Sequence, residues 1–435
     1  MNNHSNRQEI FGWQMYDWAN SAFSTTVTAV FLSPYLTNLA KAAADANGLV
    51  HIWGIPIAYD SFWAYCVSLS VLLQVLILPI LGAIADYSQL RKTMLVVFAN
   101  IGALATILLC VVSGNLWGLG GVLFIIANLS FGVALVFYNA YLPDIAAPAD
   151  RDKVSSRGFA LGYLGGGLLL LLNLMLFNQL ADKGLAIRIN LASAGVWWLL
   201  FGQYSFTQLK PRQARRPLPA GENYLSIGFK QLSLTLRTAR LYPQTLLFLL
   251  AYLIYNDGVQ TVINISAVYG SEELKIGSGT LALVILMVQF LAIGGSLLFE
   301  QLAKRTGTKW SIVISLVIWA GLTVYAYAFL QTTTQFFGMA AVLALVLGGS
   351  QALSRSLFSQ MIPLGRESEF FSFYEISERG TSWLGPLLFG VVNQITGSLR
   401  LGILSLLVFF VVGLIILVFV NVQQAITQAQ QHEPA

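Results

Sequence analysis

The sequence predicts an all-α membrane protein in which twelve transmembrane helices form two pseudo-symmetric six-helix bundles. Apolar and aromatic residues make up 56% of the 435 residues, charged residues only 10%, and the mean hydropathy is +0.70. A soluble domain carries about 25% charged residues, so an ordinary water-soluble protein is excluded. Long apolar runs recur along the chain, and one hydrophilic stretch divides them into two groups of six. A disordered chain is excluded because it would have low apolar content.

Each apolar run approaches the roughly 20 residues that a helix needs to cross the hydrocarbon layer. The runs are continuous, which indicates helices and not the short alternating strands of a membrane barrel. The predicted spans are 10–35, 61–85, 93–113, 118–140, 158–178 and 190–208, followed by 245–268, 278–300, 311–331, 335–354, 377–396 and 401–421. Residues 1–208 are therefore predicted to form an N-terminal bundle, 209–242 a cytoplasmic linker, and 243–435 a C-terminal bundle with a short cytoplasmic tail.

Positive charge is sorted between the two sides of the predicted protein. The chain has 24 Lys and Arg against 19 Asp and Glu, a formal net charge of +5. With the N-terminus in the cytoplasm, 19 basic residues fall in cytoplasmic segments and five fall opposite, namely Lys41, Lys183, Arg188, Lys275 and Arg400. Cytoplasmic loops carry the excess of Lys and Arg, so both termini are expected in the cytoplasm. This sorting explains the basic charge without a nucleic-acid partner.

The hydrophilic linker has a helical pattern of its own. Its apolar positions are Leu225, Phe229, Leu232 and Leu236, and its basic positions elsewhere on the helical wheel are Lys230, Arg237 and Arg240. The spacing predicts an amphipathic helix over 224–240 that lies on the cytoplasmic membrane surface. The alternative is a solvated tether between the two halves.

No metal or cofactor site is expected. Cys66 and Cys110 lie in separate apolar runs with no second thiol near either. The three histidines lie outside every run, at His4, His51 and His432, whereas zinc sites need grouped Cys and His. The polar N-terminus lacks the pattern of a cleaved signal peptide, so the first apolar run is expected to remain as a span.

Repeated residues at equivalent spans indicate an ancient duplication. Tyr16 and Asn20 in the first span match Tyr252 and Asn256 in the seventh, and Ser155-x-Arg157-Gly158 matches Ser377-x-Arg379-Gly380. Between the second and third spans, Gly82 and Asp86 precede the basic pair Arg91 and Lys92. A small residue, an acid at a helix end and a basic turn suit a cytoplasmic latch that breaks when the halves move. An ordinary positive-inside turn is the alternative.

Two six-span halves with a GxxxD…RK loop resemble the major facilitator superfamily, although the second glycine of that loop is missing and Gln89 and Leu90 intervene. More specifically, the sequence is similar to the vacuole effluxer-like branch in the motifs YDWANSAF (16–23), FYNAYLPDIA (137–146), SSRGFALGYLGGG (155–167), YNDGVQT (255–261), GGSQALSRSLF (348–358) and SWLGPLLFG (382–390). The namesakes of that branch release amino acids from the yeast vacuole. The resemblance implies a central cavity lined by spans 1, 4, 7 and 10.

Two acids lie well inside apolar runs, Asp17 in the first span and Asp257 near the middle of the seventh. An ionised carboxylate in hydrocarbon costs several kcal/mol, so such an acid is by default a functional candidate. Reversible proton binding or substrate binding is the prediction, and capping of a broken helix or a hydrogen bond to Trp or Tyr is the alternative. The polar residues able to orient a small zwitterion around these acids are Asn20, Ser21, Tyr138, Asn139, Asn256, Gln260, Thr261 and Gln351. For Tyr138 and Gln351, interhelical hydrogen bonding is an equal alternative.

Charged residues near the cytoplasmic ends of the spans are candidates for a gate, namely Asp86, Arg91, Arg157, Arg355 and Arg379. Snorkelling of long basic side chains to the interface is the alternative. The sequence thus predicts a secondary active transporter, not an enzyme, that moves a small polar solute by alternating access with proton coupling. Amino acids are the substrate class that the resemblance implies. The expected protein is a functional monomer in the inner or plasma membrane, or in the vacuolar membrane of a eukaryote. A lipid-handling protein or a sensor is the alternative function.

Overall fold

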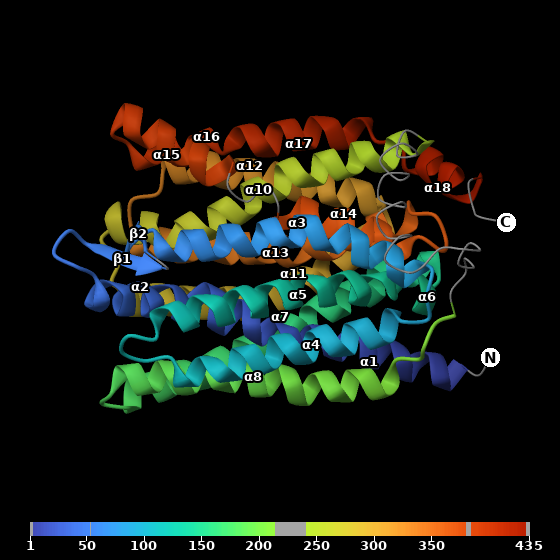
Figure 1. Cartoon of the computed structure of the whole chain (residues 1–435). Coiled ribbons are helices and arrows are strands. Elements are labelled where there is room, and N and C mark those ends of the chain that lie inside the picture. Colours follow the sequence, from blue (N-terminus) through green and yellow to red (C-terminus); the bar gives the residue numbers. More distant parts are fainter. Residues whose placement is uncertain (1–2, 53, 214–240, 380–383, 432–435) are drawn as a thin grey trace. The chain divides into compact units, whose positions relative to one another are not determined.

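The computed structural model of the chain describes residues 3–52, 54–213, 241–379 and 384–431, and its elements are almost all helices (Figure 1). Ten described helical segments are long and apolar enough to cross a membrane. They coincide with the second to tenth and the twelfth predicted spans. The all-helical membrane class is therefore confirmed, with ten of the twelve predicted spans meeting this criterion.

The first and eleventh predicted spans have a different construction. The first consists of α1 (Asn3–Ala22), the π-helix η1 (Phe23–Phe31) and α2 (Leu32–Ala43) in direct succession. At the eleventh, α14 (Glu367–Arg379) precedes α15 (Leu384–Thr396), and the residues between them lie outside the described part of the chain. The predicted surface helix at 224–240 also lies outside the described residues.

By internal packing, the chain divides into two compact units. Unit 1 comprises Met1–Leu78, Leu90–Tyr138 and Leu161–Arg212, and unit 2 comprises Pro79–Gln89, Asn139–Ala160 and Gln213–Ala435. Two segments of the N-terminal half, 79–89 and 139–160, thus pack within unit 2 among helices of the C-terminal half. The bundle boundaries at 208 and 243 stay a prediction.

Unit 1 contains the helices of the N-terminal half except for those two segments. After α2 come a hairpin of β1 (Leu49–Ile52) and β2 (Ile55–Ala58), then α3 (Phe62–Asp86), α4 (Arg91–Leu108), the 3-10 turn η2 (Leu109–Val111), α5 (Trp117–Ala140), α7 (Arg151–Gln179) and α8 (Lys183–Gln208). The hairpin is antiparallel, with Leu49 opposite Ala58 and Ile52 opposite Ile55. Its strands were not expected from the sequence.

Small residues and polar side chains hold these helices together. A Cβ atom on Gly195 of α8 would lie 2.6 Å from the Ile107 amide nitrogen of α4, so only glycine permits this approach. Gln74 of α3 donates to the Asn128 carbonyl of α5 at 3.1 Å, and Asn128 donates to Ser70 at 2.8 Å. In a membrane, such bonds and close contacts replace the hydrophobic effect between helices.

Unit 2 contains the long helices of the C-terminal half. They are α10 (Pro243–Glu272), α11 (Ser278–Thr306), α12 (Thr308–Ala328), α13 (Thr333–Gln360), α14, α15, α16 (Leu399–Ser405), α17 (Leu407–Phe419) and α18 (Val422–Gln431), and the N-terminal half adds α6 (Leu142–Ile145) and the 3-10 turn η3 (Pro148–Asp150). Helices α10 and α17 lie side by side (Figure 1). Local sequence explains where some helices begin: Thr332 and Gln335 form a capping box at α13, and Ser398 caps α16.

Candidate functional site

Asp257 lies on α10 with 1% of its surface exposed. Neither of its carboxylate oxygens has a hydrogen-bond partner among the described residues. Helix α15 approaches closely at this level, because a Cβ atom on Gly385 would collide with the Thr261 side chain of α10. A buried carboxylate without partners is costly, which makes this position suited to a proton or a cationic ligand.

The polar residues predicted beside Asp257 are engaged to different degrees. The Thr261 hydroxyl donates to the Asp257 carbonyl at 2.7 Å, so it serves the backbone of its own helix. Asn256 donates to the Glu378 carbonyl of α14 at 3.0 Å. Gln260 and Gln351 are half-buried, on α10 and α13. The structure therefore ties Asn256 to α14, a connection that the sequence did not indicate.

The predicted residues of the first span lie together in unit 1. Asp17 and Asn20 are buried on α1, and Ser21 is half-buried. Helix α7 packs against them, since a Cβ atom on Gly162 would lie 2.7 Å from the Ser21 hydroxyl and 3.2 Å from the Asp17 carbonyl oxygen. The Asn20 side-chain nitrogen has no hydrogen-bond partner among the described residues. On the same helix, the Tyr16 hydroxyl and the Trp18 indole nitrogen likewise have no hydrogen-bond partner among the described residues.

Tyr138 and Asn139 are neighbours in the chain but belong to different clusters. The Tyr138 ring stacks on Trp13 with centroids 4.4 Å apart and lies 4.9 Å from Tyr16, inside unit 1. The Trp13 indole N–H donates to the Tyr138 carbonyl at 2.8 Å. Asn139 belongs to unit 2, where it meets charged side chains of the C-terminal half. Asn139 therefore lies with the gate candidates.

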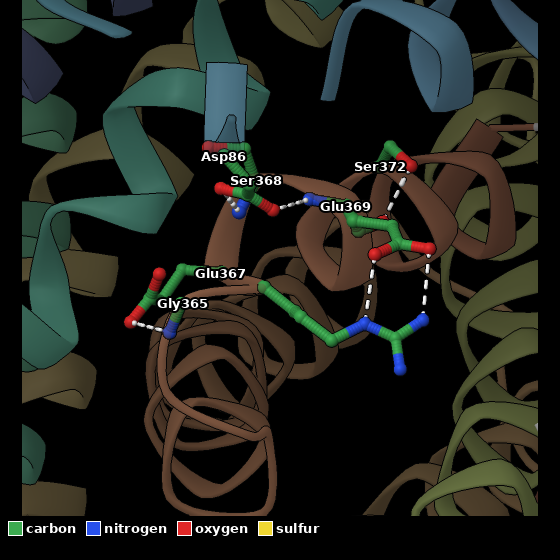
Figure 2. Close-up of polar contacts among 7 residues, drawn as sticks. Asp86, Gly365, Glu367, Ser368, Glu369 and Ser372 are labelled. Atoms are coloured by element: carbon green, nitrogen blue, oxygen red, sulfur yellow. Dashed lines mark hydrogen bonds and ion pairs between the residues drawn. The ribbon is translucent and has the colours of Figure 1, made fainter. Parts of the chain in front are cut away.

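Asp86, at the end of α3, caps the first turn of α14 (Figure 2). Its Oδ1 accepts the Ser368 backbone N–H at 3.0 Å and its Oδ2 accepts the Glu369 N–H at 2.9 Å. Helix N-termini leave these N–H groups unsatisfied and carry a partial positive charge, so an incoming carboxylate is favourable. We call this pair of contacts the α14 latch. Asp86 was predicted as an acid at a helix end, and the structure shows that its partner is the N-terminus of α14.

The loop before α14 is held by its own buried charges. Arg366 forms a bidentate pair with Glu369, at 2.9 Å to Oε2 and 3.0 Å to Oε1. The Glu367 carboxylate accepts the Gly365 N–H at 2.9 Å. Glu367 and Glu369 are both labelled in Figure 2, together with Asp86. Bidentate Arg–carboxylate pairs fix geometry as well as charge. The Arg366–Glu369 pair therefore helps to position the backbone N–H groups of Ser368 and Glu369, which donate to Asp86.

A second polar cluster joins the 139–160 segment to α13 and α14. Arg355 donates through Nε to the Ser155 hydroxyl at 2.9 Å and through Nη2 to the Ser155 carbonyl at 3.1 Å. Asn139 accepts from Arg355 at 3.4 Å and donates to Glu375 Oε1 at 2.8 Å. Arg379 reaches Glu375 Oε2 at 3.4 Å. We call Asn139, Ser155, Arg355, Glu375 and Arg379 the Glu375 cluster.

The other two gate candidates lie elsewhere. Arg157 has a half-exposed side chain and forms an ion pair with Glu300 at 3.8 Å, while Lys304 approaches the same acid at 2.6 Å. Glu300 itself is buried, so both pairs join a buried carboxylate to a half-exposed cation. Arg91 is buried at the start of α4 and belongs to unit 1. Of the five predicted gate residues, the structure therefore brings Arg355 and Arg379 into one cluster and Asp86 to the latch.

Several residues of this region were not singled out from the sequence, among them Glu378 and Arg151. Glu378 accepts the Tyr252 hydroxyl at 3.2 Å and, through its carbonyl, the Asn256 amide. Arg151 donates to the Ser359 carbonyl at 2.6 Å and to the Ala146 carbonyl at 3.2 Å. Only its spacing could have pointed to Glu378. It lies three residues after Glu375, and residues three apart are neighbours on a helix surface. Among the residues that the structure describes, no group of three or more His, Cys, Asp or Glu could hold a metal ion.

Comparison with known proteins identifies a family. The family model for vacuole effluxer Atg22-like proteins matches residues 5–430. The chain is 33% identical over 426 residues to the "uncharacterized MFS-type transporter YxiO" of Bacillus subtilis (strain 168), covering 96% of each chain. It is 28% identical to "autophagy-related protein 22" of Yarrowia lipolytica, covering 88% of this chain and 80% of that one.

Solved structures agree in fold. The proton:xylose symporter XylE, of the major facilitator superfamily, superposes with a TM-score of 0.67 at 14% identity, covering 97% of each chain. A bacterial homologue of the iron transporter ferroportin gives the same TM-score and identity, covering 95% of this chain and 98% of that one. At this identity the likeness concerns the fold alone. Together with the match over 5–430, the chain belongs to the Atg22-like vacuole effluxer family of major facilitator superfamily transporters.

Proposed function

We propose that this protein is a secondary active transporter that moves amino acids across a membrane by alternating access and couples this movement to protons. Amino acids are the substrate class that the resemblance to the vacuole effluxer-like branch implies, and the match to the vacuole effluxer Atg22-like family supports an effluxer. The observation that supports proton coupling is the buried carboxylate of Asp257, which has no hydrogen-bond partner among the described residues. A group in this environment gains by binding either a proton or a cationic substrate amine.

The two polar clusters of unit 2 support the alternating-access part of the proposal. The α14 latch and the Glu375 cluster both join segments of the N-terminal half to helices of the C-terminal half through side-chain hydrogen bonds. Such bonds can break and re-form as a set, which is what a gate between two states requires. Asp86, Asn139 and Arg355 would then hold one side of the transport path closed.

The proposed orientation in the membrane is supported by the charge distribution. We place both termini and the 209–242 segment in the cytoplasm, and the protein in the inner or plasma membrane, or in the vacuolar membrane of a eukaryote. The excess of Lys and Arg on one side supports this orientation. The expected functional form is a monomer surrounded by lipid.

Transport by proteoliposomes tests the proposal. Vesicles containing the purified protein are offered a mixture of labelled amino acids with and without a pH gradient. One pH unit is worth about 1.4 kcal/mol and supports at most about tenfold accumulation for one proton per solute. In Asp257→Asn, accumulation should fall to the level of simple equilibration, whereas exchange at equal pH should persist, because the amide keeps the shape of the protonated acid.

Matched variants separate a coupling role from a structural one. Asp17→Asn should reduce accumulation less than Asp257→Asn, because Asp17 lies nearer the cytoplasmic end in the proposed topology. Asp150→Asn, the same change at an exposed acid, should leave transport unaltered. If Asp257→Asn still concentrates solute, Asp257 has no part in coupling. Loss of labelled lipid asymmetry without uptake of any solute would instead indicate a lipid-handling protein.

A further inference from the structure

Glu375 is a carboxylate buried within the Glu375 cluster, with 1% of its surface exposed. It makes one short hydrogen bond, in which the neutral amide of Asn139 donates to Oε1 at 2.8 Å. Its contact with a positive charge is long, at 3.4 Å from Arg379 Nε to Oε2. Charge-assisted bonds of this type are normally about 2.7–2.9 Å long. These contacts therefore stabilise the charged form of Glu375 only weakly, although the carboxylate is deeply buried.

Charged groups of both signs lie near Glu375. Glu378 lies three residues further along α14, and Arg379 is the basic residue of the same turn. Arg355, on α13, uses its Nε and Nη2 on Ser155, and its guanidinium lies over the Phe159 ring at 4.2 Å. Other titratable groups near these acids, among the described residues, are the hydroxyls of Tyr374 on α14 and of Tyr252 and Tyr255 on α10. The negative charge of Glu378 repels a negative charge on Glu375, and this repulsion favours retention of a proton on Glu375.

We propose that Glu375 is a second proton-carrying group of the transporter, which is protonated while α14 is bound to Asn139 and loses its proton when this contact opens. This rests on the alternating-access function proposed above. Protonation is compatible with the observed bond, because the Asn139 amide can donate to the carbonyl oxygen of a neutral carboxyl group as well as to a carboxylate.

The sign of the pH dependence follows from the burial. Glu375 precedes the predicted eleventh span, and burial raises the pKa of its carboxyl, as does the negative charge of Glu378, whereas Arg379 and Asn139 lower it. Once exposed to water, the same carboxyl would titrate at its ordinary value of about 4.3. The closed contact therefore binds the proton more tightly than the open one. Lower pH should stabilise the closed contact, and higher pH should open it.

Helix α14 also connects this group to the buried acid of α10. The Glu378 carbonyl, three residues after Glu375, accepts the amide of Asn256, the residue directly before Asp257. A movement of α14 that separates Glu375 from Asn139 would therefore pull on α10 beside Asp257. Proton release at Glu375 can in this way be coupled to proton or solute binding at Asp257.

Accessibility of a buried cysteine tests the proposal without knowledge of the substrate. Ser156 follows Ser155 on α7, is fully buried, and its hydroxyl has no hydrogen-bond partner among the described residues, so Ser156→Cys is a mild change. The reporter is placed in the full chain with Cys66 and Cys110 replaced by Ser, reconstituted in nanodiscs, and reacted with maleimide. Rates are divided by that of the exposed variant Gln89→Cys at the same pH, which removes the pH dependence of the thiol itself.

The expected result has three parts. The normalised rate should rise with pH by up to about tenfold for each pH unit between the ordinary carboxyl pKa of about 4.3 and the raised pKa of the buried Glu375, and should level off above the latter. In Glu375→Gln it should stay at the low-pH level throughout, because the amide mimics the neutral carboxyl. In Glu378→Gln the rise should persist but shift to lower pH, because a negative charge that raises the pKa of Glu375 has been removed.

Either of two results would overturn the proposal: a wild-type rate that does not change with pH, or a rise with pH that survives in Glu375→Gln. If Glu375→Gln does not fold, Asn139→Ala provides the test, since removal of the donor should give a high rate at low and high pH alike. A low or strongly pH-dependent rate in Asn139→Ala would equally reject the idea. Because this readout needs no solute, failure of amino-acid transport and failure of the Glu375 gate are distinguishable.

Discussion

The carboxylate of Asp86, at the end of α3, accepts the backbone N–H of Glu369 in the first turn of α14 at 2.9 Å, and its second oxygen accepts the neighbouring N–H of Ser368. An N-cap side chain normally satisfies these positions from within its own helix. Here the acceptor comes from a residue more than 280 positions earlier in the chain. A loop acid of the first half therefore completes a helix of the second half.

Replacement of Asp86 should weaken the α14 latch. Asp86→Asn keeps the size of the side chain but removes the charge and places an NH₂ group opposite a backbone N–H. Loss of a helix cap costs about 0.5–2 kcal/mol, so the normalised labelling rate of Ser156→Cys should increase about 2- to 30-fold. The same change at the exposed Asp150 should leave the rate unchanged. Equal rates in Asp86→Asn and in the parent would show that the latch does not control access.

Gly82 permits the close approach of α3 to α14. A Cβ atom at this position would lie 2.6 Å from the Ser368 carbonyl oxygen and 3.1 Å from the Glu369 Cα, both backbone atoms that cannot rotate away. Gly82→Ala should therefore displace the first turn of α14 and raise the labelling rate in the same assay as Asp86→Asn.

A helix-interior glycine in open space provides the control for that change. A Cβ atom on Gly321 of α12 would meet nothing within 4 Å. Gly321→Ala should be neutral or stabilise its helix by up to about 1 kcal/mol, the difference in helix propensity. Thermal unfolding in detergent should separate the two alanine variants. Unfolding temperatures that shift equally would argue against a steric role for Gly82.

Membrane topology can be tested by the accessibility of two single cysteines. Gln213, the last residue of the described range 54–213, and Asn47, in the turn before the β1–β2 hairpin, are both exposed. The distribution of Lys and Arg predicts that they lie on opposite sides of the membrane. Gln213→Cys should react with an impermeant maleimide only from the cytoplasmic side of sealed vesicles, and Asn47→Cys only from the other. Labelling of both from one side would contradict the twelve-span topology.

The predicted surface helix at 224–240 should bind anionic lipid through its basic face. Each Lys or Arg near such a surface contributes about 1 kcal/mol. Replacement of Lys230, Arg237 and Arg240 by Gln should increase the solvent accessibility of a cysteine placed at Phe229, and addition of salt should do the same to the parent protein. If the triple replacement leaves accessibility unchanged, the segment is a solvated tether.

The membrane class and the family follow from the sequence, because both depend on patterns that are local in the chain. Apolar runs of about 20 residues identify spans wherever they lie, and ten of those predicted are described as suitable helices. The depth of Asp257 in an apolar run likewise predicted a buried acid, and its exposed fraction of 1% agrees. The sequence did not predict the β1–β2 hairpin or the π-helix η1, because neither a short hairpin nor a helix with more residues per turn changes the hydropathy of the sequence.

Partners across the chain were decided by the tertiary structure alone. Asp86 and Asn139 looked like a loop acid and a cavity residue, yet α14 meets both, through Glu369 and Glu375. These contacts join residues separated by more than 230 positions, and no periodicity in a single sequence encodes such a distance. The physical reason is that buried polar groups take whichever complementary group the packing of helices delivers. The sequence by itself determined which groups must be buried, and the packing decided which of them meet.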